Sequence, residues 1–346
     1  MSQQNVIRIP GERNSLKNFK AFKEPIPKPA KHEVLIKVHS VSLNYRDVGV
    51  ALSLYPFPTK DNVVPCSDAA GVVVEVGEGV KNVAKDDHVI STFDPTNLYG
   101  QQMNWDNGHG APVDGVLREY ITVTAAAVVK VPKDSPQSFS EWSTLVCTGV
   151  TAWNALYGLT PLKPGQVVLC QGTGGVSITG LILAKAAGAV TIVTSSSDEK
   201  LAYVKEKFGA DYTINYKTHP EWSKEVHRLT NGEGVDYVLE NGGSGTIAES
   251  INSVKMGGNV SVIGFLSKAT EMPDVASMAL AKGAVVRGVV VGSTQLLQEV
   301  VRFVSRKGLR LPVEKEFGFS EENVIKAFEH LTSGSHIGKV CIKLVE

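Results

Sequence analysis

Residues 160–291 constrain the fold more than any other part of the chain, because short apolar runs and helix-like segments alternate along them. Glycine, proline and polar residues bound the runs, and the links are short. Such alternation predicts a parallel sheet with helices on both faces. The expected strands are Gln166–Gln171, Ala189–Thr194, Asp211–Ile214, Asp236–Glu240, Asn259–Phe265 and Ala284–Val291, and the expected helices are Val176–Ala187, Asp198–Phe208, Glu221–Leu229 and Thr246–Val254.

A glycine-rich loop joins the first expected strand to the first helix, and it consists of Gly172, Thr173, Gly174, Gly175, Val176 and Ser177. Between a buried strand and a helix, this pattern indicates a dinucleotide site. Gly172 permits a tight turn, and Gly174 lets the main chain approach a pyrophosphate that the N–H groups of the helix start attract. Ser177 replaces the third glycine of G-x-G-x-x-G and is small enough to keep helix and strand close. The alternative is a glycine turn that binds nothing.

The end of the second expected strand carries hydroxyl groups where a site for NAD usually has an acidic residue. Ser195 and Ser196 occupy this place, and Lys200 follows one turn into the next helix. These groups can donate to a 2′-phosphate, so the sequence predicts NADP(H) as the cofactor. The competing interpretation is a capped helix with Lys200 as a solvated surface lysine. Tyr216, at the end of the third strand, either flanks the adenine or is an exposed turn residue.

Ligands of parallel sheets lie beyond the carboxyl ends of the strands. The residues at the ends of the later strands are therefore further candidates for holding the nicotinamide ribose and carboxamide. They are Asn241, Gly264, Phe265 and Val291. For each of them the alternative is a residue that only turns the chain.

The first 140 residues have a different sequence pattern, which predicts short valine-rich strands such as Glu33–Ser42 and glycine turns. The long polar stretch Asp94–Val116 predicts either a mobile loop or a lid over a substrate. After Gly292 the chain is expected to form more helix and to end in the strand Gly338–Leu344.

Length and charge exclude several classes of protein. The chain has 346 residues, enough for two domains at about 100–200 residues each. Its 35 basic and 35 acidic residues give a net charge of +0, which disfavours nucleic acid and membrane partners. The four cysteines form no C-x-x-C pair, and the amino terminus has no apolar leader, so we expect a cytoplasmic protein without a disulfide framework.

Several segments together resemble the medium-chain dehydrogenase/reductase superfamily. They are Leu43–Asp47, Pro65–Val73, Lys85–Val89, Asp114–Tyr120, Cys147–Trp153 and the glycine-rich loop. The resemblance spans nearly the whole chain. It implies an α/β protein with a GroES-like, β-rich catalytic domain (residues 1–147 and 294–346) and a Rossmann domain with a doubly wound parallel sheet (residues 148–293).

The resemblance also bears on metal content. Zinc alcohol dehydrogenases of this superfamily bind catalytic zinc at positions that match Asn44, Ser67 and Cys147. An amide, a hydroxyl and one thiolate make a poor zinc site, so we expect no metal. The sequence is then similar to the zinc-free branch of quinone oxidoreductases, enoyl reductases and zinc-type alcohol dehydrogenase-like proteins.

That branch delivers hydride from NADPH to a conjugated double bond, which needs no metal because its β carbon is already electrophilic. The resemblance implies catalytic roles for four residues. Asn44 would donate to the substrate carbonyl or the nicotinamide, Thr151 would lie by the nicotinamide, and Tyr45 would wall the substrate pocket. Tyr55, in a Tyr-Pro pair, is the candidate proton donor or enolate anchor, with a core or pocket-wall tyrosine as the alternative.

Three functions remain open at this point. The first is a zinc-free NADP(H)-dependent reductase of enones or quinones, and the second is an NADP(H)-dependent alcohol or aldehyde dehydrogenase. The third is a nucleotide-binding protein without catalysis. The partner in the first two is a small-molecule substrate. The valine-rich sixth strand suggests a homodimer that pairs at this edge.

Overall fold

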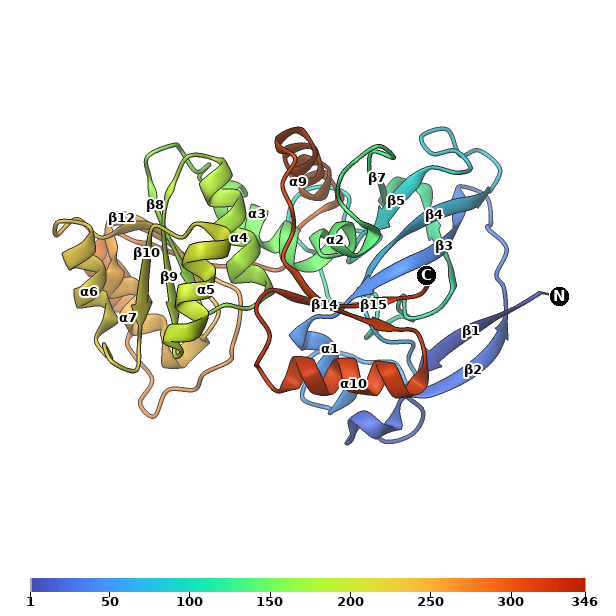
Figure 1. Cartoon of the computed structure of the whole chain (residues 1–346), viewed down its shortest axis with the longest axis horizontal. Coiled ribbons are helices and arrows are strands. Elements are labelled where there is room, and N and C mark those ends of the chain that lie inside the picture. The colour runs from blue at the N-terminus through green and yellow to red at the C-terminus, as the bar shows by residue number, and fades with distance from the viewer. Residues whose placement is uncertain (1, 346) are drawn as a thin grey trace. The chain divides into compact units, whose positions relative to one another are not determined.

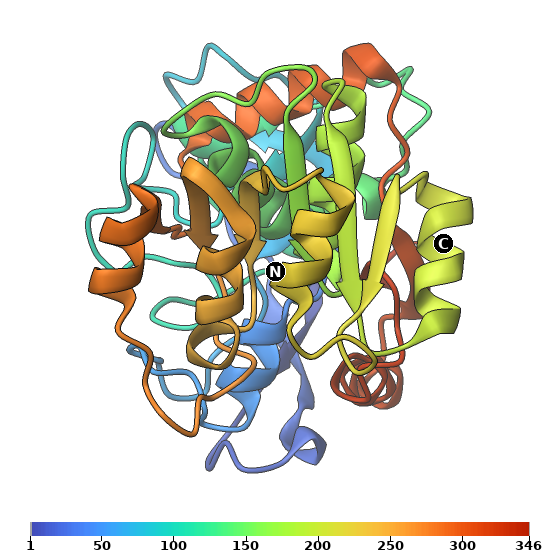
Figure 2. The ribbon, with the colours of Figure 1, turned by 90° about the vertical axis from the view of Figure 1, so that its left-hand side faces the viewer.

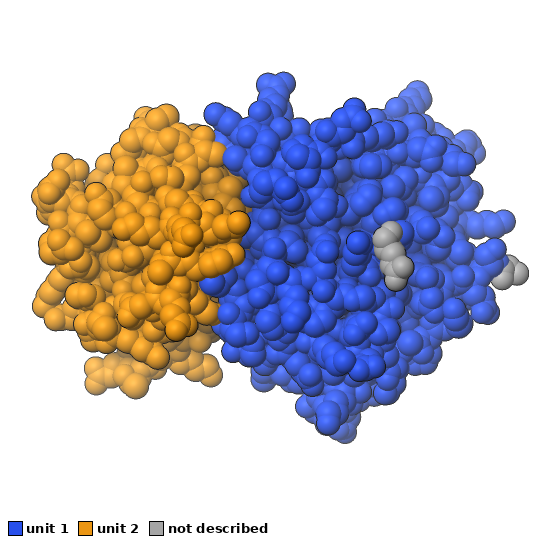
Figure 3. Space-filling view, in the orientation of Figure 1, with its two compact units in different colours: residues 1–150, 291–346 blue, residues 151–290 orange. Residues whose placement is uncertain are grey.

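The structure is a computed structural model that describes residues 2–345. It divides the chain into two compact units (Figure 3). One unit comprises residues 1–150 and 291–346, and the other comprises residues 151–290. Each unit is built around its own sheet.

The unit of residues 151–290 contains a six-stranded sheet in the order β10-β9-β8-β11-β12-β13, and every neighbouring pair is parallel. The strands are β8 (Val167–Gln171), β9 (Val190–Ser195), β10 (Tyr212–Asn215), β11 (Val235–Glu240), β12 (Val254–Val262) and β13 (Val285–Gly288). The helices are α3 (Val150–Tyr157), which begins one residue before the unit, α4 (Gly175–Ala186), α5 (Asp198–Phe208), α6 (Trp222–Leu229), α7 (Ile247–Ser253) and α8 (Val275–Lys282). The expected doubly wound parallel sheet is confirmed.

Helices cover both faces of this sheet. Figure 1 shows α4 and α5 on one side of it and α6 and α7 on the other, and Figure 2 shows the strands running side by side between helices. All six residues of β11 are buried, as expected of a central strand covered on both faces. Ser197 caps the start of α5 by accepting from Lys200 N, and Gly209 ends it in the left-handed conformation, with φ of 71°.

Two strands differ from the sequence-based expectation by several residues, whereas the others in this sheet shift by at most one residue at either end. β12 begins at Val254 and ends at Val262, and β13 ends at Gly288 although apolar residues continue to Val291. Val291 has a φ of 48°, which a β-branched residue rarely adopts and which is incompatible with a continued strand. α8 was not expected from the sequence.

The unit of residues 1–150 and 291–346 contains a seven-stranded sheet in the order β14-β15-β3-β4-β5-β7, with β6 also paired to β3. Its strands are β3 (Glu33–Ser42), β4 (Asp68–Val76), β5 (His88–Ser91), β6 (Tyr120–Thr124), β7 (Val128–Lys130), β14 (Val313–Gly318) and β15 (Lys339–Lys343). Its helices are α1 (Tyr45–Ala51), α2 (Phe139–Ser143), a π-helical turn (Leu145–Gly149), α9 (Thr294–Lys307) and α10 (Glu321–Thr332). Strand β15 pairs with β3, so β15 and β14 complete a sheet whose other strands lie within residues 33–130.

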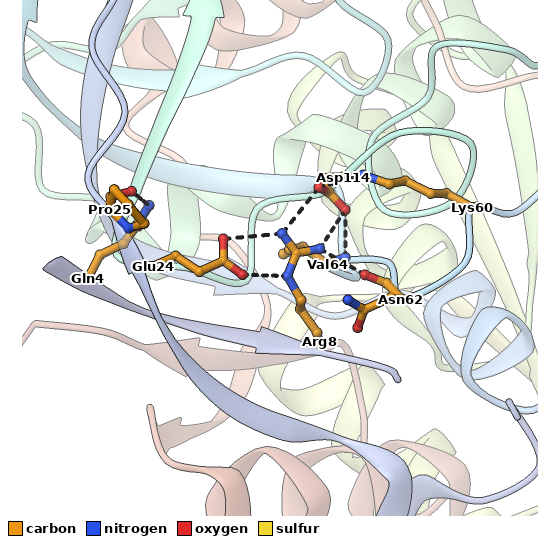
Figure 4. A network of polar contacts seen from close by, with 8 residues as sticks. All are labelled: Gln4, Arg8, Glu24, Pro25, Lys60, Asn62, Val64 and Asp114. Atoms are coloured by element: carbon orange, nitrogen blue, oxygen red, sulfur yellow. Dashed lines mark hydrogen bonds and ion pairs between the residues drawn. The ribbon is translucent and has the colours of Figure 1, made fainter. Parts of the chain in front are cut away.

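A separate antiparallel ribbon of β1 (Gln3–Arg8) and β2 (Lys20–Pro25) is held by a polar network around Arg8 (Figure 4). The Arg8 guanidinium donates to both carboxylate oxygens of Glu24 and to the Asn62 carbonyl at 2.8 Å. It also donates to Asp114, which accepts from Lys60 Nζ at 2.8 Å and from Val64 N at 3.0 Å. The network therefore ties the ribbon to two loops far from it in sequence.

The polar stretch Asp94–Val116 is anchored to the rest of its unit at several points. The Asn97 carbonyl accepts from Thr294 N at 2.9 Å, at the start of α9, and the Trp105 ring stacks on Phe57 with centroids 3.8 Å apart. Of the helices formed by the described residues, none combines the length and the apolar character that crossing a membrane requires.

Candidate functional site

The glycine-rich loop forms an open helix start. Gly172 has a φ of 78°, and its N–H donates to the Thr194 carbonyl at 2.9 Å, so the loop turns sharply between β8 and α4. A Cβ added at Gly172 or at Gly174 would meet no atom within 4 Å. Gly174 is the N-cap of the twelve-residue helix α4 and supplies no side chain to its N–H groups. The loop therefore leaves both space and unused donors for a pyrophosphate, and the fit to a dinucleotide is good.

The third position of the pattern, Ser177, is buried and bonded to the strand before it. Its Oγ donates to the Gln171 carbonyl and accepts from Asn241 Nδ2 at 2.9 Å. Asn241 Nδ2 also donates to the Gln171 carbonyl at 3.2 Å. The serine thus joins α4 to the ends of β8 and β11. Asn241, a predicted cofactor ligand, uses its amide group to hold these ends together.

A buried carboxylate, Glu240, organises the loop that follows β11. It accepts from the backbone N–H groups of Gly242 and Gly243, both at 2.8 Å. It also accepts from Thr246 Oγ1 at 2.6 Å and from Gln171 Nε2 at 2.7 Å. The Gly264 N–H donates to the Glu240 carbonyl at 3.2 Å, so the loops that contain Asn241 and Gly264 lie together. Phe265, the next residue, is 59% exposed.

The end of β9 brings together most of the residues predicted to select the cofactor. Ser195 Oγ accepts from Ser197 N at 3.3 Å, and the Ser195 carbonyl accepts from Tyr216 N at 3.0 Å. The Tyr216 side chain is 42% exposed. Ser196 is half-buried, and Lys200 lies in the first turn of α5. Asp198, also in this turn, accepts from Asn215 Nδ2 at 2.8 Å. Strand β9 itself ends at Ser195 and carries no acidic residue.

The remaining predicted residues divide between the units. Thr151 is buried on α3 in the unit of residues 151–290. Asn44, Tyr45, Tyr55 and Val291 belong to the other unit. Tyr45 is 52% exposed and Tyr55 is half-buried, whereas Asn44 is buried at the start of α1.

The charged side chains of Lys339, Asp47 and Asp68 lie against Asn44, and Arg46 pairs with Asp47 at 3.6 Å. The Asn44 Oδ1 atom accepts from Lys339 Nζ at 2.6 Å, and its backbone N–H donates to Asp47 Oδ2 at 2.8 Å. Lys339 is only 3% exposed and also donates to the Leu43 carbonyl. Burial raises the pKa of Asp47 to about 6, although Arg46 and Lys339 oppose this shift. The cluster therefore places two cations against two buried carboxylates, of which Asp68 is the second.

Asp68 connects the other two positions that match zinc ligands in the family. Its Oδ1 accepts from Ser67 Oγ at 2.6 Å, and its Oδ2 accepts from Cys147 N at 3.2 Å. Burial raises the pKa of Asp68, and Lys339, Ser67 and the nearby Asn44 amide oppose the shift. Burial and the charge of Asp68 raise the pKa of the Cys147 thiol to about 12, so this thiol is neutral at ordinary pH.

Arg46 lies between two aromatic rings. Its guanidinium carbon is 5.0 Å from the Tyr55 ring centroid and 4.7 Å from that of Phe93, and Nη1 donates to the His109 carbonyl at 2.8 Å. Within the described part of the chain, Arg46 Nε and Nη2, Asn44 Nδ2 and His109 Nε2 are buried and have no hydrogen-bond partner. Because buried polar groups are almost always hydrogen-bonded, this concentration of unused groups marks a place for water or a polar ligand.

The side chains at the three zinc-ligand positions do not fit a catalytic zinc ion. Asn44 Oδ1 already accepts from an ammonium group, and Ser67 donates to Asp68, so Cys147 is the one soft ligand among the three positions. Zinc needs about three thiolate, imidazole or carboxylate ligands. Among residues 2–345, no group of three or more His, Cys, Asp or Glu side chains is arranged to hold a metal ion.

Sequence reasoning missed Lys339, Arg46 and Glu240 as members of these sites. Arg46 stands inside a segment that the family resemblance rests on, but nothing in the sequence distinguishes its guanidinium from a surface charge. Lys339 is 295 residues from Asn44, so no local pattern could pair them. For Glu240, the apolar run Tyr237–Leu239 directly before it was an available signal, since an acidic residue that follows a buried run must find buried partners.

Comparisons with known proteins extend this picture. An alcohol dehydrogenase GroES-like domain matches residues 30–133, and a zinc-binding dehydrogenase domain matches residues 175–306. A zinc-type alcohol dehydrogenase-like protein of Schizosaccharomyces pombe is 41% identical over 319 residues, which are 90% of this chain and 91% of that protein. An acryloyl-coenzyme A reductase of Sulfurisphaera tokodaii is 32% identical over 268 residues, which are 75% of this chain and 76% of that enzyme.

Among solved structures, a provisionally assigned alcohol dehydrogenase of Sinorhizobium meliloti is similar over 99% of this chain and 100% of its own. Its TM-score is 0.91 and its sequence is 35% identical.

Proposed function

This chain belongs to the medium-chain dehydrogenase/reductase superfamily, and from that premise we propose that it is a zinc-free, NADP(H)-dependent reductase of activated double bonds in enones or quinones. The resemblance stated from the sequence is thereby confirmed at the level of the superfamily, and the chain is an oxidoreductase of that family. The cofactor, the substrate class and the absence of zinc are the proposed part.

The observation that carries the proposal is the set of side chains at the three zinc-ligand positions. A saturated ketone or alcohol reacts by hydride transfer only when its oxygen is polarised or deprotonated, and zinc does this in alcohol dehydrogenases of the family. Asn44 accepts from the Lys339 ammonium, Ser67 donates to Asp68, and Cys147 is then the one soft ligand where such an ion would be bound. Electrophilicity must then come from the substrate, as it does in a conjugated carbonyl compound.

The dinucleotide site is proposed to lie at the glycine-rich loop. The N–H groups at the start of α4 would hold the pyrophosphate, while Ser195, Ser196 and Lys200 would bind a 2′-phosphate. Bound NADPH supplies a hydride to the substrate. Thr151, Gly264, Phe265 and Val291 are proposed contacts of its nicotinamide half.

Asn44 and Tyr55 are proposed to act on the substrate. The Asn44 amide donates to the carbonyl oxygen, on which negative charge develops as the β carbon is reduced. Tyr55 supplies the proton that completes the reaction or steadies the enolate. Arg46, beside the Tyr55 ring, favours the tyrosinate that remains after this transfer.

A substrate panel tests the reaction class. NADPH oxidation is followed with enones, quinones, aldehydes and simple ketones, and the metal content of the same preparation is measured. We expect kcat/KM to be highest for a conjugated substrate and to survive prolonged chelation. A preference of more than a decade for saturated aldehydes or alcohols, or stoichiometric zinc that leaves together with activity, would contradict the proposal.

A nucleotide titration tests the cofactor. We expect wild type to bind NADPH more tightly than NADH. Lys200→Ala should lower NADPH affinity by about one to two decades, which is what a charge-assisted hydrogen bond contributes to binding. NADH affinity should stay unchanged. Lys205→Ala, which removes another lysine of α5, is the matched control. Tighter binding of NADH by wild type would contradict the assignment.

An NADP(H)-dependent alcohol dehydrogenase is the second candidate, since the S. pombe and S. meliloti relatives carry alcohol dehydrogenase names. It would need a proton donor in place of zinc, and the same substrate panel distinguishes it. A nucleotide-binding protein without catalysis is the third, and transfer of label from deuterated NADPH to any enone would exclude it.

A further inference from the structure

We propose that Lys339 is a positioning residue that fixes the side-chain amide of Asn44, so that Asn44 presents Nδ2 rather than Oδ1 to the substrate oxygen. This inference rests on the proposed function, because it concerns how the proposed substrate contact is made. Nothing in the local sequence suggests it, since the two residues lie on β15 and at the start of α1.

The Lys339 ammonium is held in one place. It is 3% exposed, and it donates to Asn44 Oδ1 at 2.6 Å and to the carbonyl of Leu43. The positive charge of Lys339 acts to lower the pKa of the neighbouring Asp47 and Asp68 carboxyls, against the effect of burial. A buried ammonium needs such partners, because an unpaired charge is expensive to remove from water. These contacts hold the ammonium group against Asn44.

The chemistry of the pair sets the orientation of the amide. A lysine ammonium has three donors and no acceptor, so the atom of Asn44 that faces it must be the oxygen. The opposite orientation would turn two N–H donors toward a cation. The Asn44 backbone N–H is bonded to Asp47 Oδ2, which fixes the main chain from which the amide projects.

The other end of the amide makes no hydrogen bond of ordinary geometry. Asn44 is 6% exposed, and its Nδ2 is buried without such a partner among the described residues, although the amide lies close enough to Asp68 to lower the pKa of that carboxyl. A buried donor without a partner needs a water molecule or a polar ligand to complete its hydrogen bond. A carbonyl oxygen that becomes an enolate is such a partner. Lys339 then has the role of a fixed cation that acts on the reaction through the orientation of one amide.

A double-mutant cycle tests the inference. The variants are Lys339→Met, Asn44→Ser and the combination, and the measurements are kcat and KM for the best enone or quinone, the NADPH dissociation constant and the melting temperature. Methionine fills the space of the lysine stem without the charge, and serine is tolerated at a helix N-cap. Lys343→Met, an exposed lysine of the same strand, is the matched control.

We expect Lys339→Met to lower kcat about ten- to a hundredfold, as for loss of one donor to a developing oxyanion, with a smaller change in KM. In the Asn44→Ser background the same substitution should change kcat less than threefold. Lys339→Arg should keep most of the activity because it still donates to Oδ1. If Lys339→Met does not fold, a Lys339→Arg variant that has the wild-type melting temperature but an about tenfold lower kcat would contradict the positioning role. Lys343→Met should match wild type.

Two results separate the possible failures. If Asn44→Ser keeps full kcat, the proposed contact between Asn44 and the substrate is wrong. If Asn44→Ser is impaired but Lys339→Met is not, or Lys339→Met lowers kcat by the same factor in both backgrounds, the positioning role is wrong while the proposed function stands.

Discussion

At the scale of single residues, the surroundings of Tyr55 decide what this side chain can contribute. Its ring packs edge-on against Phe57, with centroids 5.2 Å apart, and faces the Arg46 guanidinium on another side. Burial raises the pKa of Tyr55, and Arg46 opposes the shift. The phenol therefore stays protonated throughout the ordinary pH range, which is the state that a proton donor requires.

Tyr55→Phe removes the proton while it keeps the ring and its packing. We expect kcat to fall roughly ten- to a thousandfold, within the ~10²–10⁴-fold that general acid catalysis contributes. The NADPH dissociation constant and the melting temperature should remain near wild type. Steady-state kinetics with an enone gives the answer, and a variant of full activity would remove Tyr55 from the mechanism while leaving the reaction class open.

At the scale of elements, the end of β11 shows how one buried carboxylate shapes a binding loop. Glu240→Leu would leave the N–H groups of Gly242 and Gly243 without their acceptor, at about 1–3 kcal/mol for each group that stays buried. We expect a lower melting temperature and at least about tenfold weaker NADPH binding. Glu233→Leu, exposed in the turn before the same strand, is the control and should change neither. Unchanged NADPH affinity of Glu240→Leu would show that this loop is not part of the cofactor site.

The ribbon of β1 and β2 is likewise held by one carboxylate, that of Asp114, which accepts from Arg8. Burial opposes ionisation, but the bonds from Lys60, Val64 N and Arg8 lower the pKa of Asp114 below its usual range. A carboxyl whose pKa is depressed by folding contributes stability above its unfolded pKa of about 3.9, and this contribution is lost as the pH falls through the lower, folded value.

Asp114→Asn should therefore be less stable than wild type at pH 7, by about 1.5–3 kcal/mol if charged hydrogen bonds dominate. The difference should shrink as the pH falls below about 4. Thermal melts from pH 7 to pH 3 measure it, with Asp106→Asn in an exposed part of the same loop as the control. A difference that stays constant with pH would mean that the charge of Asp114 is not what holds the ribbon.

At the scale of the whole molecule, the six-stranded sheet has an edge at β13, which pairs only with β12 among the described residues. Val285 is 38% exposed on this edge. An uncovered apolar edge strand favours pairing with a second copy.

We expect a homodimer, whose mass by light scattering would be about 74 kDa, twice the 37.1 kDa of one chain. Val285→Lys should shift the mass toward that of the monomer, because like charges would face each other across a symmetric edge. Met256→Lys, which adds the same charge at an exposed position of the interior strand β12, should stay dimeric. A wild-type mass of 37.1 kDa would refute the dimer.

Much of the secondary structure in both units follows from the sequence alone. Strand β3 and helix α5 have the predicted bounds, Glu33–Ser42 and Asp198–Phe208, and the alternation of strands and helices predicted the parallel sheet correctly. These features depend on hydrophobic periodicity, on turn residues and on capping groups within a few residues of each element. Such information is local, so these elements can be predicted from the sequence.

Only the tertiary structure decided the surroundings of the reactive groups. The contact of Lys339 with Asn44, the network of Glu240 with Gln171 and the ribbon tied by Arg8 to Asp114 each join residues separated by 69 to 295 positions. The family resemblance indicated which positions to inspect, but it did not reveal that an ammonium group lies against Asn44. Hydrogen bonds between distant segments leave no periodic trace in a chain, because their geometry exists only after the sheets have formed and buried the polar groups together.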